Sequence, residues 1–136
     1  AAVVDATSLT GELDLTSSLV NSFEAMAGSG GSDITIASTT QTAAITGGAG
    51  ADVVDASSIT TGTIVFEGGA GNDKLMVNIA NSDAATVVFD GGTGTDTLVL
   101  ANGADLTSAT VTLASVETFD VDGAAATIKA VFIKTP

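Results

Sequence analysis

A nine-residue pattern that occurs three times constrains the fold of this chain more than any other feature. It reads GGAGADVVD at 47–55, GGAGNDKLM at 68–76 and GGTGTDTLV at 91–99. Each copy fits G-G-x-G-x-D-x-U-x, where U is a large apolar residue. The glycines permit a tight turn with positive φ and leave main-chain carbonyls uncovered. The apolar residue two places after the aspartate starts a short strand and points into a core. Each copy therefore predicts a glycine turn followed by a strand.

The aspartate of each copy predicts a metal ligand, because its carboxylate is the hard, anionic oxygen donor that Ca²⁺ prefers. A single copy would be ordinary turn chemistry, since Gly and Asp are common in turns. Three copies with an apolar residue at the same offset favour calcium turns over β-turns without metal. A fourth, degenerate copy, GSGGSDITI at 28–36, keeps its aspartate as Asp33 but has Ser29 and Thr35 at the second-glycine and apolar positions. We expect a half-site there.

The spacing of the copies indicates a repeat architecture. The glycine turns begin at residues 28, 47, 68 and 91, which are 19, 21 and 23 residues apart. Tandem nonapeptides would place calcium turns on both edges of a roll, whereas one turn every twenty residues places them all on one edge. Each coil should then hold two short strands, for example 53–54 with 63–66. A period in this range is typical of solenoids. We expect an all-β fold, a parallel β-roll or β-helix solenoid with coils of about 20 residues and calcium-binding turns on one edge.

Two sequence echoes extend this interpretation. VVDATSLTGELDL at 3–15 resembles VVDASSITTGTIVF at 53–66, whose VVD follows a glycine turn. This echo predicts that the chain begins directly after a missing glycine turn. Because the chain also has no initiator Met, no signal peptide and no linker, we expect residues 1–136 to be a single β-solenoid domain from a longer secreted protein. SFEAM at 22–26 echoes SVETF at 115–119, and the shared pattern favours a strand in both places over a short helix in the first.

The C-terminal segment TIKAVFI at 127–133 alternates weakly and predicts a final strand. The hydrophobic content of 45% argues against a disordered acidic tail despite the net charge of −13. With 16 acidic residues against three lysines, the chain has the wrong charge for nucleic-acid binding. No segment approaches the roughly 18 consecutive apolar residues of a membrane span, so we expect no membrane insertion.

The placement of the acids separates two roles. Packed carboxylates repel one another unless a divalent cation lies between them, and the repeat pattern predicts such a cation at Asp33, Asp52, Asp73 and Asp96. The alternative is an acidic, solvated surface. We expect that role for Asp5, Asp14, Asp83, Asp105, Asp120, Asp122, Glu12, Glu24 and Glu117.

The chain contains no cysteine, histidine, tyrosine or tryptophan. This excludes a disulfide, a Ser-His-Asp triad and a zinc site with His or Cys ligands within the chain. A pair of carboxylates could cleave glycosides, but sugar sites generally use aromatic surfaces, and the five phenylalanines are expected in the core. We therefore predict no enzymatic activity. Calcium is the stabiliser that remains, since extracellular concentrations fill even sites with a Kd of about 10⁻⁴–10⁻³ M.

The three nonapeptides resemble those of the RTX (repeats-in-toxin) family, and the long Ala/Thr/Gly/Asp spacers look like those of bacterial surface-layer and adhesin-type proteins. The resemblance implies that the turns of adjacent coils sandwich Ca²⁺ between aspartate carboxylates and glycine-loop carbonyls. It implies one ion held by Asp52 and Asp73, a second by Asp73 and Asp96, and a weaker third by Asp33 and Asp52. The implied ligand set is Asp33, Gly47, Gly48, Ala49, Gly50, Asp52, Gly68, Gly69, Ala70, Gly71, Asp73, Gly91, Thr93 and Asp96. Glu67 and Asp90 remain open as further ligands.

The same resemblance implies a calcium-dependent structural module of a secreted surface-layer or adhesin-type protein at the bacterial cell surface. Two or three Ca²⁺ ions would drive its folding and assembly. Its partners would be further copies of itself, lattice neighbours or cell-surface polysaccharide. The alternative is the C-terminal RTX calcium roll of a type I-secreted protease or lipase, although such rolls usually carry tandem nonapeptides. A Thr-rich face could also bind ice or carbohydrate. The threonines form no regular spacing in the sequence, so β-propensity explains them better.

Overall fold

The computed structural model describes residues 2–18, 21–37, 40–79, 85–101, 104–122 and 132–134. These segments contain strands and no helix. Within them there is therefore no helix long and apolar enough to cross a membrane. The strands are β1 (Ala2–Asp5), β2 (Leu13–Ser17), β3 (Ser22–Met26), β4 (Ser32–Ile36), β5 (Thr40–Ala49), β6 (Asp52–Ala56), β7 (Thr61–Ala70), β8 (Lys74–Val77), β9 (Ala85–Thr93), β10 (Thr97–Ala101), β11 (Thr110–Ala114), β12 (Thr118–Asp122) and β13 (Phe132–Lys134).

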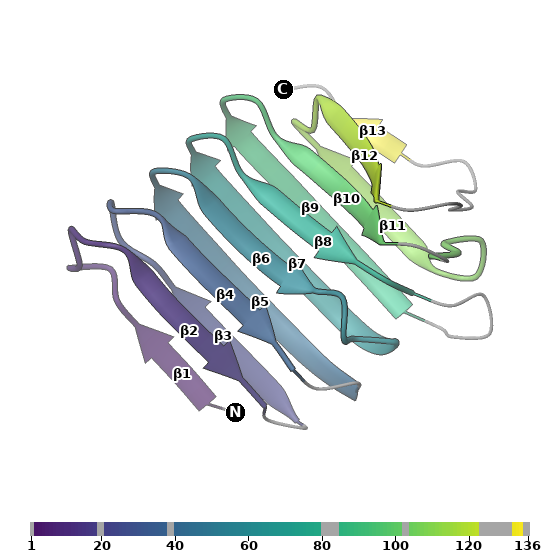
Figure 1. The fold of residues 1–136 in the computed structure, drawn as a ribbon, viewed down its shortest axis with the longest axis horizontal. Coiled ribbons are helices and arrows are strands. Elements are labelled where there is room, and N and C mark those ends of the chain that lie inside the picture. The colour runs from purple at the N-terminus through teal and green to yellow at the C-terminus, as the bar shows by residue number, and fades with distance from the viewer. Residues whose placement is uncertain are drawn as a thin grey trace.

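The strands form two parallel sheets that face each other (Figure 1). The odd sheet has the order β1-β3-β5-β7-β9-β11-β13, and the even sheet has the order β12-β10-β8-β6-β4-β2. One odd strand and the even strand that follows it make one coil, and each strand pairs with its counterpart in the next coil. The predicted all-β solenoid is confirmed, with about 5 turns of about 21 residues each.

The core lies between the two sheets and consists of columns of apolar side chains. The parallel register aligns Ile45 with Phe66 and Phe66 with Phe89, and the two phenylalanine rings stack with centroids 5.1 Å apart. In the even sheet the apolar residue of each nonapeptide is aligned with the next, at Val54, Leu75 and Leu98, all fully buried. Fully burying one such side chain contributes about 1.5–3 kcal/mol. The repeated motif therefore supplies both the turn and the core residue of each coil.

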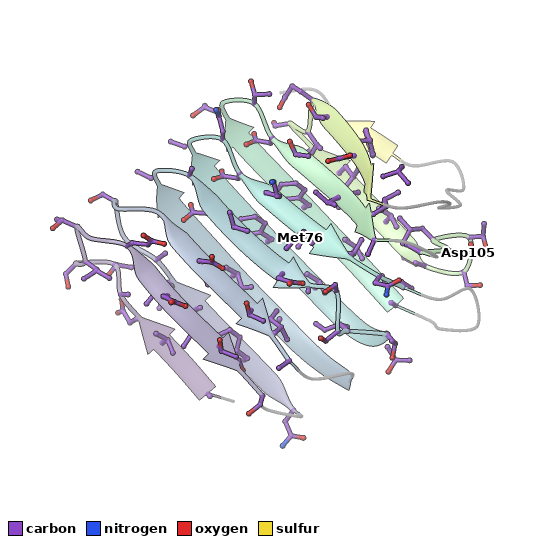
Figure 2. The ribbon with its side chains drawn as sticks, in the orientation of Figure 1. Met76 and Asp105 are labelled. Atoms are coloured by element: carbon purple, nitrogen blue, oxygen red, sulfur yellow. The ribbon has the colours of Figure 1, made fainter. Side chains whose placement is uncertain are left out.

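Strand side chains alternate between this core and the outer faces. Figure 2 shows Met76 on β8, on the solvent side of the even sheet, and Asp105 in the turn between β10 and β11. Met76 is half-buried, whereas its neighbours Leu75 and Val77 are fully buried. The pairing register therefore decides which residues face the core, because a one-residue shift moves a side chain from the core to the outer face.

The strand predicted at 22–26 is confirmed as β3. The strand predicted at 115–119 is wrong in its first part, because residues 115–117 form a turn and β12 begins at Thr118. The C-terminal strand predicted at 127–133 falls partly on β13, and residues 127–131 lie outside the described segments.

The echo between 3–15 and 53–66 does not mark equivalent positions in the repeat. Residues 3–5 lie in β1 of the odd sheet, whereas 53–55 lie in β6 of the even sheet. The echo therefore gives no support for a glycine turn before residue 3, and that inference stays untested. The shared letters encode a local turn instead: Asp5 accepts hydrogen bonds from the main-chain N–H and hydroxyl of Thr7, and Asp55 accepts the same pair from Ser57.

Candidate functional site

The three glycine turns, 47–52, 68–73 and 91–96, stack on one edge of the solenoid, where each odd strand passes into the following even strand. We call this the glycine edge; it runs along the upper left of Figure 1. The register aligns Gly48 with Gly69 and Gly69 with Gly92. The predicted placement of the glycine turns on a single edge is therefore confirmed for these copies.

Glycine is required at the second position of each turn for two reasons. Gly69 has a φ of +100°, a conformation that L side chains rarely adopt. A Cβ at Gly69 would also lie 2.3 Å from the carbonyl oxygen of Gly48 in the preceding coil. Main-chain atoms of adjacent turns can therefore approach closely only because this side chain is absent.

The aspartates of the three turns form a buried column, which we call the carboxylate column. Asp52, Asp73 and Asp96 are at most 1% exposed. The Asp52 main-chain N–H donates a hydrogen bond of 2.8 Å to Asp73 Oδ1, and the Asp73 N–H donates one of 2.8 Å to Asp96 Oδ1. Each carboxylate thus links its own coil to the coil before it through one of its two oxygens.

The second oxygen of each carboxylate has no such partner. Oδ2 of Asp52, Asp73 and Asp96 is buried and accepts no hydrogen bond within the part of the chain that the structure describes. A buried, ionised carboxylate costs free energy unless its oxygens are paired. A proton or a cation bound to these three oxygen atoms would remove that cost.

Main-chain carbonyls approach these orphaned oxygens. A Cβ built on Gly47 would lie 2.2 Å from Asp52 Oδ2 and 2.5 Å from the Gly68 carbonyl oxygen. A Cβ on Gly68 would lie 2.2 Å from Asp73 Oδ2 and 2.7 Å from the Gly91 carbonyl oxygen. Because the first position of each turn is glycine, a carboxylate oxygen and a carbonyl oxygen of the next coil gather about the same point. Hard oxygens of these two kinds are calcium ligands.

The electrostatics of the column disfavour three bare charges. Burial raises the pKa of Asp52 to about 6, and the Asp73 charge adds to this rise, while hydrogen bonds from Ser32 oppose it. Burial also raises the pKa of Asp73, with the Asp96 charge adding to it. Burial raises the pKa of Asp96, helped by the charges of Glu117 and Asp90. A divalent cation at the column would offset both burial and repulsion.

The N-terminal end of the column differs from the prediction. The register aligns Ser32 with Asp52 and places Asp33 opposite Val53, so Asp33 points to the outer face and is exposed. The Ser32 hydroxyl donates a 2.8 Å hydrogen bond to Asp52 Oδ1. The predicted alignment of Asp33 with the other aspartates is therefore wrong by one residue, and a serine terminates the column at this end.

Glu117, at the C-terminal end, is exposed as predicted, but its carboxylate also reaches the column. The Asp96 N–H donates a 2.8 Å hydrogen bond to Glu117 Oε2, as the other column amides do to the next aspartate. Glu117 belongs to no nonapeptide. Its separation of 21 residues from Asp96 matches the repeat period and is the signal that could have revealed it.

The carbonyls predicted as ligands lie along the same edge, and some already accept main-chain hydrogen bonds. The Ala49 carbonyl accepts the Gly31 N–H at 3.2 Å, and the Thr93 carbonyl accepts the Gly71 N–H at 2.9 Å. A carbonyl has a second lone pair for an ion. The other predicted main-chain positions belong to the same three turns and are Gly47, Gly48, Gly50, Gly68, Gly69, Ala70, Gly71 and Gly91.

Glu67 and Asp90, which were open as further ligands, are paired across β7 and β9 on the outer face of the odd sheet and are exposed. The structure does not bring them into the column. Among the described residues, no group of three or more acidic side chains gathers around one point. A metal on the glycine edge would therefore rely on main-chain carbonyls together with the carboxylates.

Most of the acids predicted at the surface are exposed where they are described, namely Asp5, Glu12, Asp14, Glu24, Glu117 and Asp120. Asp105 is half-buried in a local turn with Thr107. Asp83 and the side chain of Asp122 lie outside the described part of the chain.

No family model matches this sequence, and searches of curated proteins and of solved structures also find no match. The resemblance to RTX repeats therefore rests on the nonapeptides themselves. The solenoid fold is compatible with that resemblance but does not by itself identify the family.

Proposed function

We propose that this protein is a non-catalytic, calcium-dependent structural module in which Ca²⁺ ions on the glycine edge hold adjacent coils together. The observation that carries the proposal is the carboxylate column with its orphaned, buried Oδ2 atoms. At neutral pH these carboxylates must either bind protons against their intrinsic pKa or share a cation. A cation that also binds the nearby carbonyls would stabilise the folded chain and not the unfolded one.

Two ions follow from the three glycine turns. One would be held by Asp52 and Asp73, and the other by Asp73 and Asp96, with carbonyls of the facing turns completing each shell. The donors are all oxygen, and several are main-chain carbonyls in fixed positions. This chemistry favours Ca²⁺ over Zn²⁺, which prefers nitrogen and sulfur, and over Mg²⁺, which retains most of its water.

The setting we propose is a secreted bacterial surface-layer or adhesin-type protein, whose assembly would involve other copies of the chain or surface polysaccharide. Extracellular calcium fills even weak sites, with a Kd of about 10⁻⁴–10⁻³ M. The absence of cysteine leaves metal as the available cross-link. The three motif coils carry one glycine turn each, in place of tandem nonapeptides, and this favours the surface setting over the calcium roll of an exported protease or lipase.

Circular dichroism and thermal unfolding at pH 7.5 test the proposal. We expect Ca²⁺ to raise the unfolding temperature of the chain strongly relative to EGTA, with Mg²⁺ at the same concentration having a much smaller effect. Identical spectra and unfolding temperatures in EGTA and in Ca²⁺ would refute it. The variant Asp33→Asn, which changes an exposed acid of the neighbouring coil, should respond to Ca²⁺ as the wild type does.

A further inference from the structure

The turn that closes the glycine edge at its C-terminal end is built differently from the three before it. The register aligns Ala114 with Asp90 and Thr118 with Thr97. Six residues connect these positions in the third glycine turn, but only Ser115, Val116 and Glu117 connect them here. Ser115 has a φ of 52°, the only positive value at a non-glycine residue in the described segments, and is 7% exposed. The short turn is therefore tightly folded against the glycine turn beside it.

This short turn nevertheless repeats the oxygen positions of the glycine turns. A Cβ built on Gly91 would lie 2.3 Å from the Ser115 carbonyl oxygen, just as one on Gly47 would lie 2.5 Å from the Gly68 carbonyl. The Glu117 carboxylate accepts the Asp96 N–H, which is the role of the next aspartate elsewhere in the column. The longer glutamate side chain thus compensates for the three missing residues.

A buried, unpartnered oxygen faces this arrangement. Asp96 Oδ2 accepts no hydrogen bond among the described residues, and it lies 2.3 Å from the same Cβ point on Gly91 that the Ser115 carbonyl approaches. The main-chain N–H groups of Glu117 and Thr118 both donate to the Asp96 carbonyl, at 3.1 and 3.0 Å, and hold the short turn in place.

We propose that Asp96, Glu117 and the Ser115 carbonyl form an additional divalent-cation site that takes Ca²⁺ at the C-terminal end of the column. The site lies outside the nonapeptide motif, and it rests on the proposed function of the glycine edge. It receives fewer main-chain carbonyls than the motif sites, because the short turn has no glycine loop. Its affinity for Ca²⁺ is therefore lower than theirs. The other end of the column has a neutral hydroxyl, from Ser32, in the equivalent place and forms no such site.

Isothermal titration of the full chain with Ca²⁺ at pH 7.5 tests the proposal. The test variant is Glu117→Gln, which keeps an oxygen to accept the Asp96 N–H but removes the charge. The control is Glu24→Gln, a glutamate exposed on β3 away from the glycine edge. We expect three ions in the wild type and in the control. We expect two in Glu117→Gln, with the weakest binding step lost and the two tighter steps unchanged.

A Glu117→Gln protein that binds as many ions as the wild type would overturn the proposal, even if its stability fell, because that result would assign Glu117 a hydrogen-bonding role only. A wild type that binds two ions would overturn it while leaving the proposed function intact, whereas a wild type that binds none would overturn both. If Glu117→Gln does not fold, the wild type alone decides the question. In a ¹⁵N-resolved calcium titration, the amides of Ser115 and Glu117 should shift in the last binding step, and amides that do not shift would refute the site.

Discussion

The aspartates of the glycine turns and those of the opposite edge of this solenoid are used in opposite ways. On the edge away from the glycine turns, Asp55 and Asp105 each accept the main-chain N–H and the hydroxyl of the residue two places later. These bonds stay within one turn. On the glycine edge, Asp73 accepts an N–H from 21 residues away and leaves its second oxygen buried and unpartnered. In our proposal a local turn needs no ion, whereas the column of carboxylates that joins separate coils binds Ca²⁺ through its unpartnered oxygens. The difference between these two sets of aspartates is therefore between local and inter-coil stabilisation.

A large effect should come from adding a methyl group where the coils of the glycine edge touch. Gly69→Ala forces a side chain into a positive φ and toward the Gly48 carbonyl. We expect it to lower the free energy of unfolding by at least about 2 kcal/mol, in urea denaturation with Ca²⁺ present. Gly11→Ala is the matched control, since nothing lies within 4 Å of its added Cβ. It should stay within about 0.5 kcal/mol of the wild type. Equal losses in the two variants would contradict the close stacking of the turns.

Stability should also depend on pH through the carboxylate column, because burial raises the pKa values of Asp52, Asp73 and Asp96. The pKa of Asp52 is about 6 in the metal-free fold, above its unfolded value of 3.8. The fold therefore binds more protons than the unfolded chain between these values. In metal-free buffer this contribution to stability is complete below pH 4 and is lost as the pH rises through about 6. Saturating Ca²⁺ should reverse the trend, because the ion binds the ionised carboxylates.

Urea denaturation between pH 4 and pH 7.5, in metal-free and calcium-saturated buffers, checks this expectation. Asp52→Asn should weaken the metal-free dependence, because it removes one of the three column carboxylates with a raised pKa. Parallel pH profiles with and without calcium would show that the column does not bind the ion.

A smaller effect, independent of calcium, is expected on the opposite edge. Asp55→Ala removes the two hydrogen bonds from Ser57 and should cost about 1 kcal/mol in both metal-free and calcium-containing buffer. Thermal unfolding in the two buffers measures this. A loss confined to the calcium-containing buffer would mean that the ion reaches the opposite edge, and the contrast between the edges would fail.

The sequence predicted the parts of the fold that repeat with a fixed local chemistry. Each nonapeptide specifies a turn, a buried acid and an inward apolar residue, so the solenoid and the single glycine edge followed from the period. The register between adjacent coils was harder to predict from the sequence. Counting glycines aligned Asp33 with Asp52, but the backbone pairs Ser32 with Asp52, and a one-residue shift reverses the face. Likewise, the similarity between residues 3–15 and 53–66 reflects the same local Asp turn, which occurs at both edges of the solenoid.

Features that depend on inter-coil register could not be read from irregular spacers. Glu117 reaches the column from a three-residue turn that carries no motif. Hydroxyl residues also form a rank on the outer face of the odd sheet, although their separations in the sequence vary from 20 to 24 residues. Its members are Ser22, Thr42, Thr63, Thr86 and Thr110. Variable turn lengths conceal such ranks until the strands are paired.

The most direct test of calcium binding at the carboxylate column is the free energy of unfolding of Asp73→Asn. It is compared with the wild type in calcium and in metal-free buffer at pH 7.5. Asn keeps the oxygen that accepts the Asp52 N–H and removes the charge shared by both motif ions. At ten times Kd each ion contributes roughly 1.4 kcal/mol, so we expect a loss of about 3 kcal/mol in calcium. In metal-free buffer the variant should be as stable as the wild type or more stable, because a buried charge is gone. An equal loss in both buffers would contradict the account.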